Sequence, residues 1–152
     1  MSEEIKTTEE LLAELPSQLS RSITFLNRQR QKFMGERLKP YGFVGSMHMI
    51  LLHIARHPGT TQDAIVSRMY IDKCNVARCT KKLEELGYIR RETGKQDRRE
   101  NNLYLTEEGE KLVPIIRGYR HDWAASVTRD LSDEESIQLI SLLDRLLHTD
   151  VQ

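Results

Sequence analysis

The sequence has few of the features that mark membrane, secreted or enzymatic proteins. No stretch approaches the roughly 18 consecutive apolar residues of a membrane helix, and the first residues are acidic where a secretory signal would be basic, so we expect a cytoplasmic protein. The only two cysteines, Cys74 and Cys79, lack the spacing of a zinc ribbon or a thioredoxin-like site. A phosphate-binding glycine loop, a nucleophile elbow and a zinc-protease helix are all missing. The sequence therefore predicts a protein that is not an enzyme and needs no cofactor.

Charge is distributed unevenly along the 152 residues, although the formal net charge is zero. Residues 68–99 hold ten basic and five acidic side chains, a net charge of +5. Residues 130–152 carry −5 and residues 1–15 carry −4. A polyanion would be attracted to the middle of the chain and repelled by both ends. Nucleic acid is thus a candidate partner of the middle segment, and an ordinary solvated charged face is the alternative.

Apolar periodicity and capping residues predict four helices in the first half of the chain. A leucine-rich run from Leu11 to Phe33 predicts a long helix that ends near residue 38, before Lys39-Pro40, with Pro16 suited to a first-turn position. Residues 44–54 repeat apolar side chains every three or four positions, as a second helix would. A third helix over 62–69 is capped by Thr60 or Thr61. Asp72 caps a fourth helix that ends at Gly87.

After residue 87 the pattern changes to that of a hairpin followed by two more helices. Residues 88–92 and 101–105 have the composition of short strands, with a polar tip between them. Thr106 begins a fifth helix, and Ser132 with Glu135 forms a capping box for a sixth. The third and fourth helices form a helix-turn-helix, which the hairpin makes winged. Tyr70 occupies the turn position where glycine is common, which indicates either a wider turn or a ring packed over the fourth helix.

The hairpin region resembles the wing signature of the MarR family of transcriptional regulators. That signature usually reads D-x-R, three residues, an aliphatic residue and then L-T-x-x-G, and residues 97–109 match it with Asp97, Arg99, Leu103, Leu105, Thr106 and Gly109. The resemblance extends to residues 61–62, 76–78 and 83–89 and accounts for nearly the whole chain. It implies a sequence-specific DNA-binding regulator, most often a repressor, that acts as a homodimer on a pseudo-palindromic operator and is released by a small-molecule effector.

The expected fold class is therefore mainly α (α+β), a winged helix-turn-helix with long N- and C-terminal helices. Residues 1–38 would be N-terminal dimerisation helices, 43–109 the DNA-binding lobe, and 110–152 the C-terminal helices that complete the dimerisation region. Dimerisation is also expected on physical grounds, because one bound module reads little sequence. The apolar faces of residues 11–33 and 137–147 are besides too large for a domain of this size to cover.

Twelve residues are expected to contact DNA. The first turn of the fourth helix would enter the major groove, so its side chains can reach bases, with Arg78 the main candidate. The start of the third helix would bring backbone amides toward phosphate, and the wing arginines would enter the minor groove. The expected residues are Thr60, Thr61, Gln62, Lys73, Cys74, Asn75, Arg78, Lys81, Lys82, Lys95, Arg98 and Arg99.

The family resemblance also implies a crevice for a small aromatic or phenolic acid between the dimerisation helices and the DNA-binding lobe. By approximate alignment, its lining would include Arg28, Tyr41, Met47, His48, His53 and Trp123. His53 and His57 have the i, i+4 spacing of a metal pair on a helix, but the sequence places no third ligand beside them. We therefore expect no metal site.

Two alternatives stay open at the level of sequence. Cys74 would face the groove near the positive end of its helix, conditions that favour the thiolate, so oxidation there could release DNA in a cysteine-based redox-sensing regulator. A bond to Cys79 is not expected, because five residues on one helix separate the Cα atoms by roughly 8 Å. The second alternative is a winged-helix module that binds proteins rather than DNA.

Overall fold

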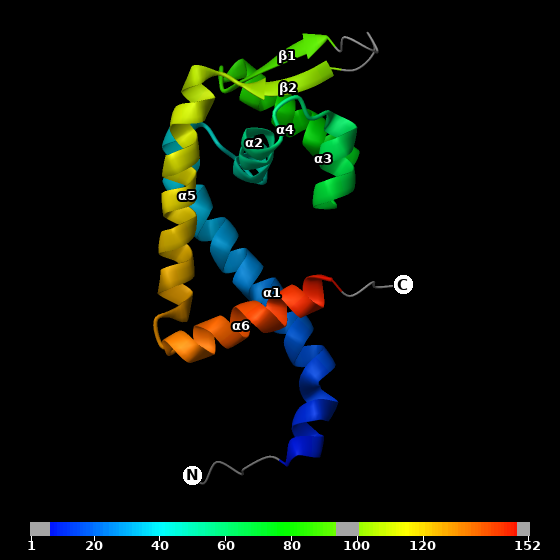
Figure 1. Cartoon of the computed structure of the whole chain (residues 1–152), viewed down its shortest axis with the longest axis vertical. Helices are drawn as coiled ribbons and strands as arrows, with labels where there is room; N and C mark the ends of the chain where they lie inside the picture. Colours follow the sequence, from blue (N-terminus) through cyan, green and yellow to red (C-terminus); the bar gives the residue numbers. More distant parts are fainter. Residues whose placement is uncertain (1–6, 94–100, 149–152) are drawn as a thin grey trace.

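Helices and one two-stranded sheet make up this computed structural model, which describes residues 7–93 and 101–148 (Figure 1). In order, the elements are α1 (Thr8–Leu38), the short 3-10 helix η1 (Lys39–Tyr41), α2 (Met47–Arg56), α3 (Gln62–Met69), α4 (Lys73–Glu85), β1 (Ile89–Thr93), β2 (Asn101–Leu105), α5 (Glu107–Thr128) and α6 (Asp133–Leu147). The expected mainly α fold with one antiparallel hairpin is confirmed.

The molecule consists of a lobe and a set of helical arms, α1, α5 and α6 (Figure 1). The lobe holds α2, α3, α4 and the hairpin, while α1 and α5 extend away from it; in this view α6 overlaps α1, and the N-terminal part of α1 extends beyond α6. Within residues 7–93 and 101–148, no helix has both the length and the apolar content that crossing a bilayer requires. In Figure 1, α6 and the N-terminal part of α1 both lie far from the hairpin.

Side-chain caps set the starts of most helices, as the sequence predicts. Thr61 caps α3 by accepting a hydrogen bond from the Ala64 amide, Asp72 caps α4, and Ser132 with Glu135 forms the capping box of α6. The expectation for Pro16 was wrong. Helix α1 begins two turns earlier, because Thr7 and Glu10 form a second capping box, so Pro16 lies inside the helix.

The core fills the lobe and the adjoining halves of α1 and α5. Its members are buried apolar side chains: Met34, Leu38, Phe43, Met47, Ile50, Leu51, Ile54, Ile65, Val76, Cys79, Leu83, Ile89, Leu103, Leu112 and Ile116. The arms differ from the lobe, because α6 has no buried residue and the buried residues of α1 are confined to its last turns. Large apolar side chains on the arms are instead exposed, as Ile137 (68% exposed) and Leu147 (80%) show.

Backbone hydrogen bonds attach the hairpin to the lobe. Leu103 donates its amide to the carbonyl of Thr60 at 2.8 Å, and its own carbonyl accepts from the amide of Gly59 at 2.9 Å. The strands pair antiparallel with Ile89 opposite Leu105. Because an isolated two-stranded hairpin is marginally stable, these bonds help to hold β2 in place.

The L-T-x-x-G motif joins the hairpin to α5. Thr106 accepts from the Gly109 amide at 3.1 Å and donates to the carbonyl of Gly87 at 2.5 Å, so one hydroxyl caps the helix and binds the end of α4. The carbonyl of Tyr88 lies so close to α5 that a Cβ on Gly109 would be 2.0 Å from its oxygen. The motif is therefore explained by a helix cap and a close backbone approach.

Tyr70 closes the turn between α3 and α4 in a left-handed conformation, with φ 52° and ψ 37°. Its side chain is 96% exposed, so the ring does not pack over the first turn of α4. A tyrosine here adopts the conformation that glycine adopts without steric cost. The turn keeps its usual form and stores backbone strain.

Replacing Tyr70 with glycine should raise the free energy of unfolding by roughly 0.5 to 1 kcal/mol, because the left-handed strain disappears and only part of that gain is lost to backbone entropy. Urea unfolding at fixed protein concentration measures the change. Tyr70→Ala is the matched control, since it removes the exposed ring but keeps a Cβ at positive φ, and it should leave stability within about 0.5 kcal/mol. A less stable Tyr70→Gly protein would contradict the strain argument.

Candidate nucleic-acid interface

Helix α4 separates its side chains into a buried face and a basic exposed face. Val76, Cys79, Thr80 and Leu83 are buried against the lobe. Lys73, Arg78, Lys81 and Lys82 are exposed. The hairpin follows α4 directly in the chain, and the two elements lie next to each other in the lobe (Figure 1). The lobe therefore presents a helix and a hairpin next to each other.

The first two turns of α4 hold their exposed cations only weakly. Lys73 Nζ lies 3.0 Å from Asp63 Oδ1, but both side chains are largely exposed, and such pairs contribute little to stability. Arg78 donates a hydrogen bond of 3.2 Å to the Oδ1 atom of Asn75. These cations can therefore exchange their present partners for phosphate or a base edge at small cost.

Asn75 turns toward the lobe rather than outward. Its Nδ2 atom donates to the Ser46 hydroxyl at 3.1 Å, and its Oδ1 atom accepts from Arg78 and, at 3.3 Å, from the Cys79 thiol. Asn75 is half-buried, whereas Cys74 beside it is exposed. The structure thus places Asn75 where it orients Arg78.

Hydrogen bonds within the lobe engage the three residues at the start of α3. The Thr61 side chain caps the helix, the Thr60 carbonyl accepts from the Leu103 amide, and the side-chain amide group of Gln62 lies 2.7 Å from the Thr80 hydroxyl. The first amides of α3 form the positive end of the helix, which suits a phosphate. Of the three residues expected to meet DNA here, Gln62 has its side chain turned toward α4.

Two arginines of β1, which the sequence did not single out, have partners within the protein. Arg90 pairs with Glu92 and lies over the ring of Tyr104, with 4.9 Å from its Cζ atom to the ring centroid. Arg91 binds Glu84 of α4 at 2.8 Å. The three wing residues expected to contact DNA, Lys95, Arg98 and Arg99, lie outside the described residues.

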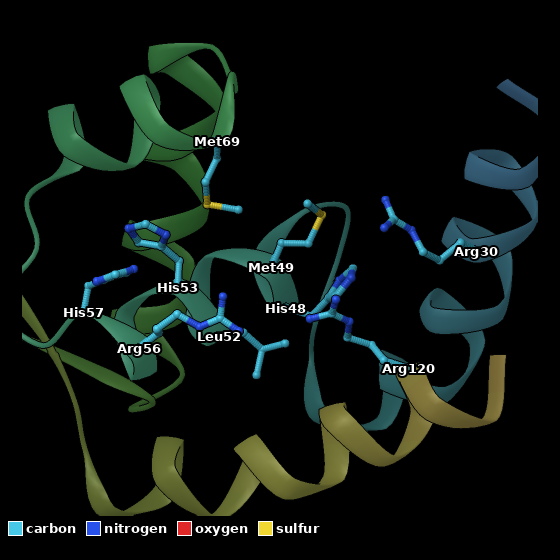
Figure 2. Close-up of a pocket in the computed structure, with 9 residues that line it drawn as sticks. All are labelled: Arg30, His48, Met49, Leu52, His53, Arg56, His57, Met69 and Arg120. Carbon is cyan, nitrogen blue, oxygen red and sulfur yellow. The ribbon is translucent and has the colours of Figure 1, made fainter. Parts of the chain in front are cut away.

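A cavity of about 200 Å³ lies where α1, α2 and α5 meet (Figure 2). Arg30 of α1, His48 of α2 and Arg120 of α5 occupy one end, and Figure 2 shows both guanidinium groups turned toward that end. His53, His57 and Met69 lie toward the other end. The described lining residues include three arginines and three histidines but no acid. The cavity is therefore electropositive and suited to an anion.

Burial and the neighbouring arginines perturb the titration of this cavity. His48 is only 7% exposed, and burial, followed by repulsion from Arg30, lowers the pKa of His48 to about 4. Burial and then the charge of Arg120 also lower the pKa of Arg30, whose guanidinium still stays charged. At neutral pH, His48 is a neutral imidazole between two cations, with one donor and one acceptor nitrogen.

A second crevice of about 300 Å³ shares Arg30 and Arg120 with the first and is lined further by Trp123. Among the described residues, the buried Trp123 Nε1 and His53 Nε2 atoms have no hydrogen-bond partner. His53 lines the first of these spaces and Trp123 lines the second. Unpaired buried polar atoms are costly, so these atoms favour a polar occupant.

The six residues expected around an effector are distributed unequally. His48 and His53 line the cavity, and Trp123 lines the adjoining crevice. Met47 is fully buried in the core, and Tyr41 packs against the core, where a hydrogen bond with Tyr119 raises the pKa of Tyr41. Arg28 is exposed and lines neither space. Arg30 and Arg120 were missed, because the sequence does not show which arginines of two distant helices converge.

The structure places the two histidines of the metal alternative side by side and leaves both cysteines free. The rings of His53 and His57 are 4.8 Å apart between centroids, and no group of three or more His, Cys, Asp or Glu side chains gathers elsewhere in residues 7–93 and 101–148. Both cysteines are free, with Cys74 exposed and Cys79 buried. Burial raises the pKa of the Cys79 thiol, so Cys79 behaves as a small core residue.

Comparison with known proteins agrees with this geometry. The sequence model of the MarR family matches residues 46–101. The HTH-type transcriptional regulator BilQ from Clostridium symbiosum is 30% identical over 114 residues, which cover 75% of this chain and 79% of that protein. The crystal structure of a MarR transcriptional regulator from Methanosarcina mazei Go1 has a TM-score of 0.83 and 27% identity, covering 86% of this chain and 94% of that one.

The same fold occurs in a mutant MarR from E. coli that was crystallised with operator DNA. That structure has a TM-score of 0.76 at 21% identity and covers 88% of this chain and 96% of that chain. The relatives are transcriptional regulators rather than enzymes. From the matched relatives, the winged helix-turn-helix and the basic face of α4, we conclude that this chain belongs to the MarR family of transcriptional regulators.

Proposed function

We propose that this chain is a cytoplasmic homodimeric repressor that binds a pseudo-palindromic DNA operator and is released from it by a small organic anion. The observation that carries the proposal is the basic exposed face of α4 beside the hairpin. A recognition helix with cations at its first turns fits the major groove, and a neighbouring hairpin fits the adjacent minor groove. Of the twelve expected contact residues, Lys73, Arg78, Lys81 and Lys82 carry exposed charge on the described part of this face.

Charge placement supports DNA as the ligand of the lobe rather than of the arms. Helix α6 begins with three acidic residues, Asp133, Glu134 and Glu135, at the end of the molecule far from the hairpin. A duplex bound along α4 would therefore not approach the acidic start of α6. A protein-binding wing would instead need an apolar surface, whereas four of the exposed side chains of α4 are the cations Lys73, Arg78, Lys81 and Lys82.

Exposed apolar side chains on α1 and α6 support a homodimer. They are Leu11, Leu12, Leu15, Leu19, Ile23, Phe25 and Leu26 on α1, and Ile137, Leu139, Ile140, Leu142, Leu143, Leu146 and Leu147 on α6. Monomeric proteins rarely leave contiguous apolar patches of this size in water. We therefore assign residues 1–38 and 110–152 to dimerisation and 43–109 to DNA binding. The last turns of α1 and the first turns of α5 also complete the core of the lobe.

Salt-dependent binding and the oligomeric state test this proposal together. If each subunit neutralises about three phosphates, log K should fall with log salt at a slope near −5 for duplex DNA, and sedimentation equilibrium should give a dimer. A slope near zero would remove DNA as the ligand and leave the protein-interaction alternative. A monomer at micromolar concentration would overturn the homodimer.

The electropositive cavity supports a small organic anion as the effector. Arg30, His48 and Arg120 come from three different helices, two of them the long arms that also contact the lobe. An anion held between Arg30 and Arg120 would draw α1 and α5 together and so change the separation of the two lobes in a dimer. Release of DNA requires that the anion bind the non-operator conformation more tightly.

Removing either arginine should weaken binding of 2-hydroxybenzoate, used as the probe, by about tenfold or more, because each charged hydrogen bond to a carboxylate contributes about 1.5 to 3 kcal/mol. Isothermal titration of the DNA-free protein with Arg30→Gln and Arg120→Gln measures this loss. Lys111→Gln is the control, since Lys111 is an exposed cation of α5 that pairs with Glu107 and Glu108. Equal affinity for 2-hydroxybenzoate in all three variants would rule out this cavity as its binding site.

Anion binding in this cavity should also become tighter as the pH falls from 7 toward 5. The pKa of His48 is about 4 in the empty protein, and a bound carboxylate would raise it by stabilising the imidazolium. The complex then binds more protons than the empty protein, so linkage makes affinity increase with acidity. Titrations in buffers of different ionisation enthalpy detect the proton uptake. Affinity that is independent of pH would place the anion away from His48.

A further inference from the structure

Three elements of the DNA-binding lobe meet at the side chain of Arg91. From β1, the Nε atom of Arg91 donates to Glu84 Oε2 of α4 at 2.8 Å. With the amide of Gln62 oriented to accept, both terminal nitrogens of Arg91 reach the Gln62 oxygen of α3, at 3.1 and 3.2 Å. The same oxygen lies 2.7 Å from the hydroxyl of Thr80, which Arg91 approaches to 3.4 Å. One guanidinium thus joins α3, α4 and β1.

Burial distinguishes this junction from the surface ion pairs nearby. Thr80 is fully buried and the Arg91 side chain is only 26% exposed, whereas the Lys73–Asp63 pair is exposed to more than 70% on both sides. Partly buried charged hydrogen bonds are stronger than exposed pairs, and the planar guanidinium restricts their geometry. The junction therefore restrains orientation in a way that the Lys73–Asp63 pair does not.

The junction adds polar side-chain bonds to β1, whose first residue, Ile89, is buried in the core. The Gly59 amide donates to the Leu103 carbonyl and the Leu103 amide donates to the Thr60 carbonyl, so these bonds attach β2, whereas β1 is the other strand of the two-stranded sheet. A two-stranded hairpin is marginally stable alone, so its direction depends on what holds each strand. Arg91 supplies the side-chain attachment of β1 to α3 and α4.

We propose that Arg91 and Gln62 act as positioning residues that lock the wing to the recognition helix, so that DNA binding by the wing depends on both although neither side chain touches DNA. The inference rests on the DNA binding proposed above. It changes the role expected for Gln62, from a phosphate contact to a support for the wing. It also explains why Gln62 faces inward at the start of a helix whose backbone would meet phosphate.

A double-mutant cycle in the full-length protein tests the junction. Gln62→Met and Arg91→Met should each weaken binding to duplex DNA by about tenfold, and the double variant should lose little more than one single variant, because either change breaks the same connection. If each wing loses one phosphate contact, the salt slope of the dimer should become shallower by about 2. Arg90→Met is the matched control, since it removes the same charge from the same strand outside the junction and should change affinity by less than threefold.

Charge loss and loss of position give different results in this design. Gln62→Met removes no charge, so unchanged affinity and salt slope in this variant, with weaker binding by Arg91→Met, would show that Arg91 contacts phosphate directly and would overturn the proposal. Arg91→Lys keeps the charge but loses the two-pronged contact with Gln62, and it should bind as weakly as Gln62→Met. Wild-type affinity in Arg91→Lys would overturn the proposal as well.

A measurement without DNA separates this proposal from the proposed function. Hydrogen exchange at the amides of residues 89–93 should accelerate by about tenfold in Gln62→Met and Arg91→Met, while exchange in α2 stays unchanged. Unchanged protection of β1 would overturn the junction even if wild-type protein binds DNA. If wild-type protein fails to bind any duplex, the proposed function fails, and the exchange rates still decide whether these residues hold β1.

Discussion

Replacing Gly109 with alanine should lower the free energy of unfolding by roughly 3 kcal/mol, which is the upper range for forcing extra volume into a packed site. The added Cβ would lie 2.0 Å from the carbonyl oxygen of Tyr88 and 3.0 Å from its carbonyl carbon. Both are backbone atoms, so no side-chain rotation relieves the overlap. Helix α5 would have to move away from the hairpin, which would also strain the Thr106 cap. Urea unfolding at equal protein concentrations measures the loss.

Gly118→Ala in the same helix is the matched control for this prediction. Nothing lies within 4 Å of a Cβ at Gly118, so alanine should raise stability by about 0.5 to 1 kcal/mol through its higher helix propensity. The two substitutions are chemically identical and should have opposite signs. A Gly109→Ala protein as stable as the wild type would contradict the close approach of Tyr88 to α5.

Replacing Arg78 with alanine should weaken operator binding by about 1 to 3 kcal/mol, or roughly five- to 150-fold, and relax the preference at one base pair of each half-site. Arg78 is exposed on the second turn of α4, and Asn75 accepts a hydrogen bond from its guanidinium while bound to Ser46. This support limits the directions in which the side chain can reach a base. Competition between operators with single base-pair changes, selected first from genomic fragments, measures both effects.

Arg129→Ala is the control for the loss of one positive charge. Arg129 follows α5 at the end of the molecule far from the hairpin, where it pairs with Asp130. Its replacement should change operator affinity less than twofold and leave base preference as it is. Unchanged base preference in the Arg78 variant would assign base recognition to other residues of α4.

Local signals explain why the sequence predicted most of the secondary structure. A cap depends on residues three or four positions apart, so Asp72, Ser132 and Thr106 could be identified without knowing any tertiary contact. The spacing of apolar residues likewise predicted the buried face of α4. Pro16 misled because the capping box at Thr7 determines where α1 begins, and the helix continues past Pro16 although proline has no amide hydrogen to donate.

Side-chain direction at the candidate site was harder to predict. Gln62 and Asn75 have the polar character of DNA contacts, yet their partners within the protein, Thr80 and Ser46, are 18 and 29 residues away along the chain. Arg30 and Arg120 are separated by most of the chain and meet at one cavity. Neither convergence leaves a periodic trace in the sequence.

The sequence by itself determined the helices, the hairpin, the wing signature and the basic segment, because each depends on chemistry within a few neighbouring residues. Only the tertiary structure decided which polar side chains face outward, which arginines share a cavity and which glycine has no room for a Cβ. Those outcomes depend on how α3, α4, β1 and α5 approach one another. The distances between them are set by packing of the whole core, which no short stretch of sequence encodes.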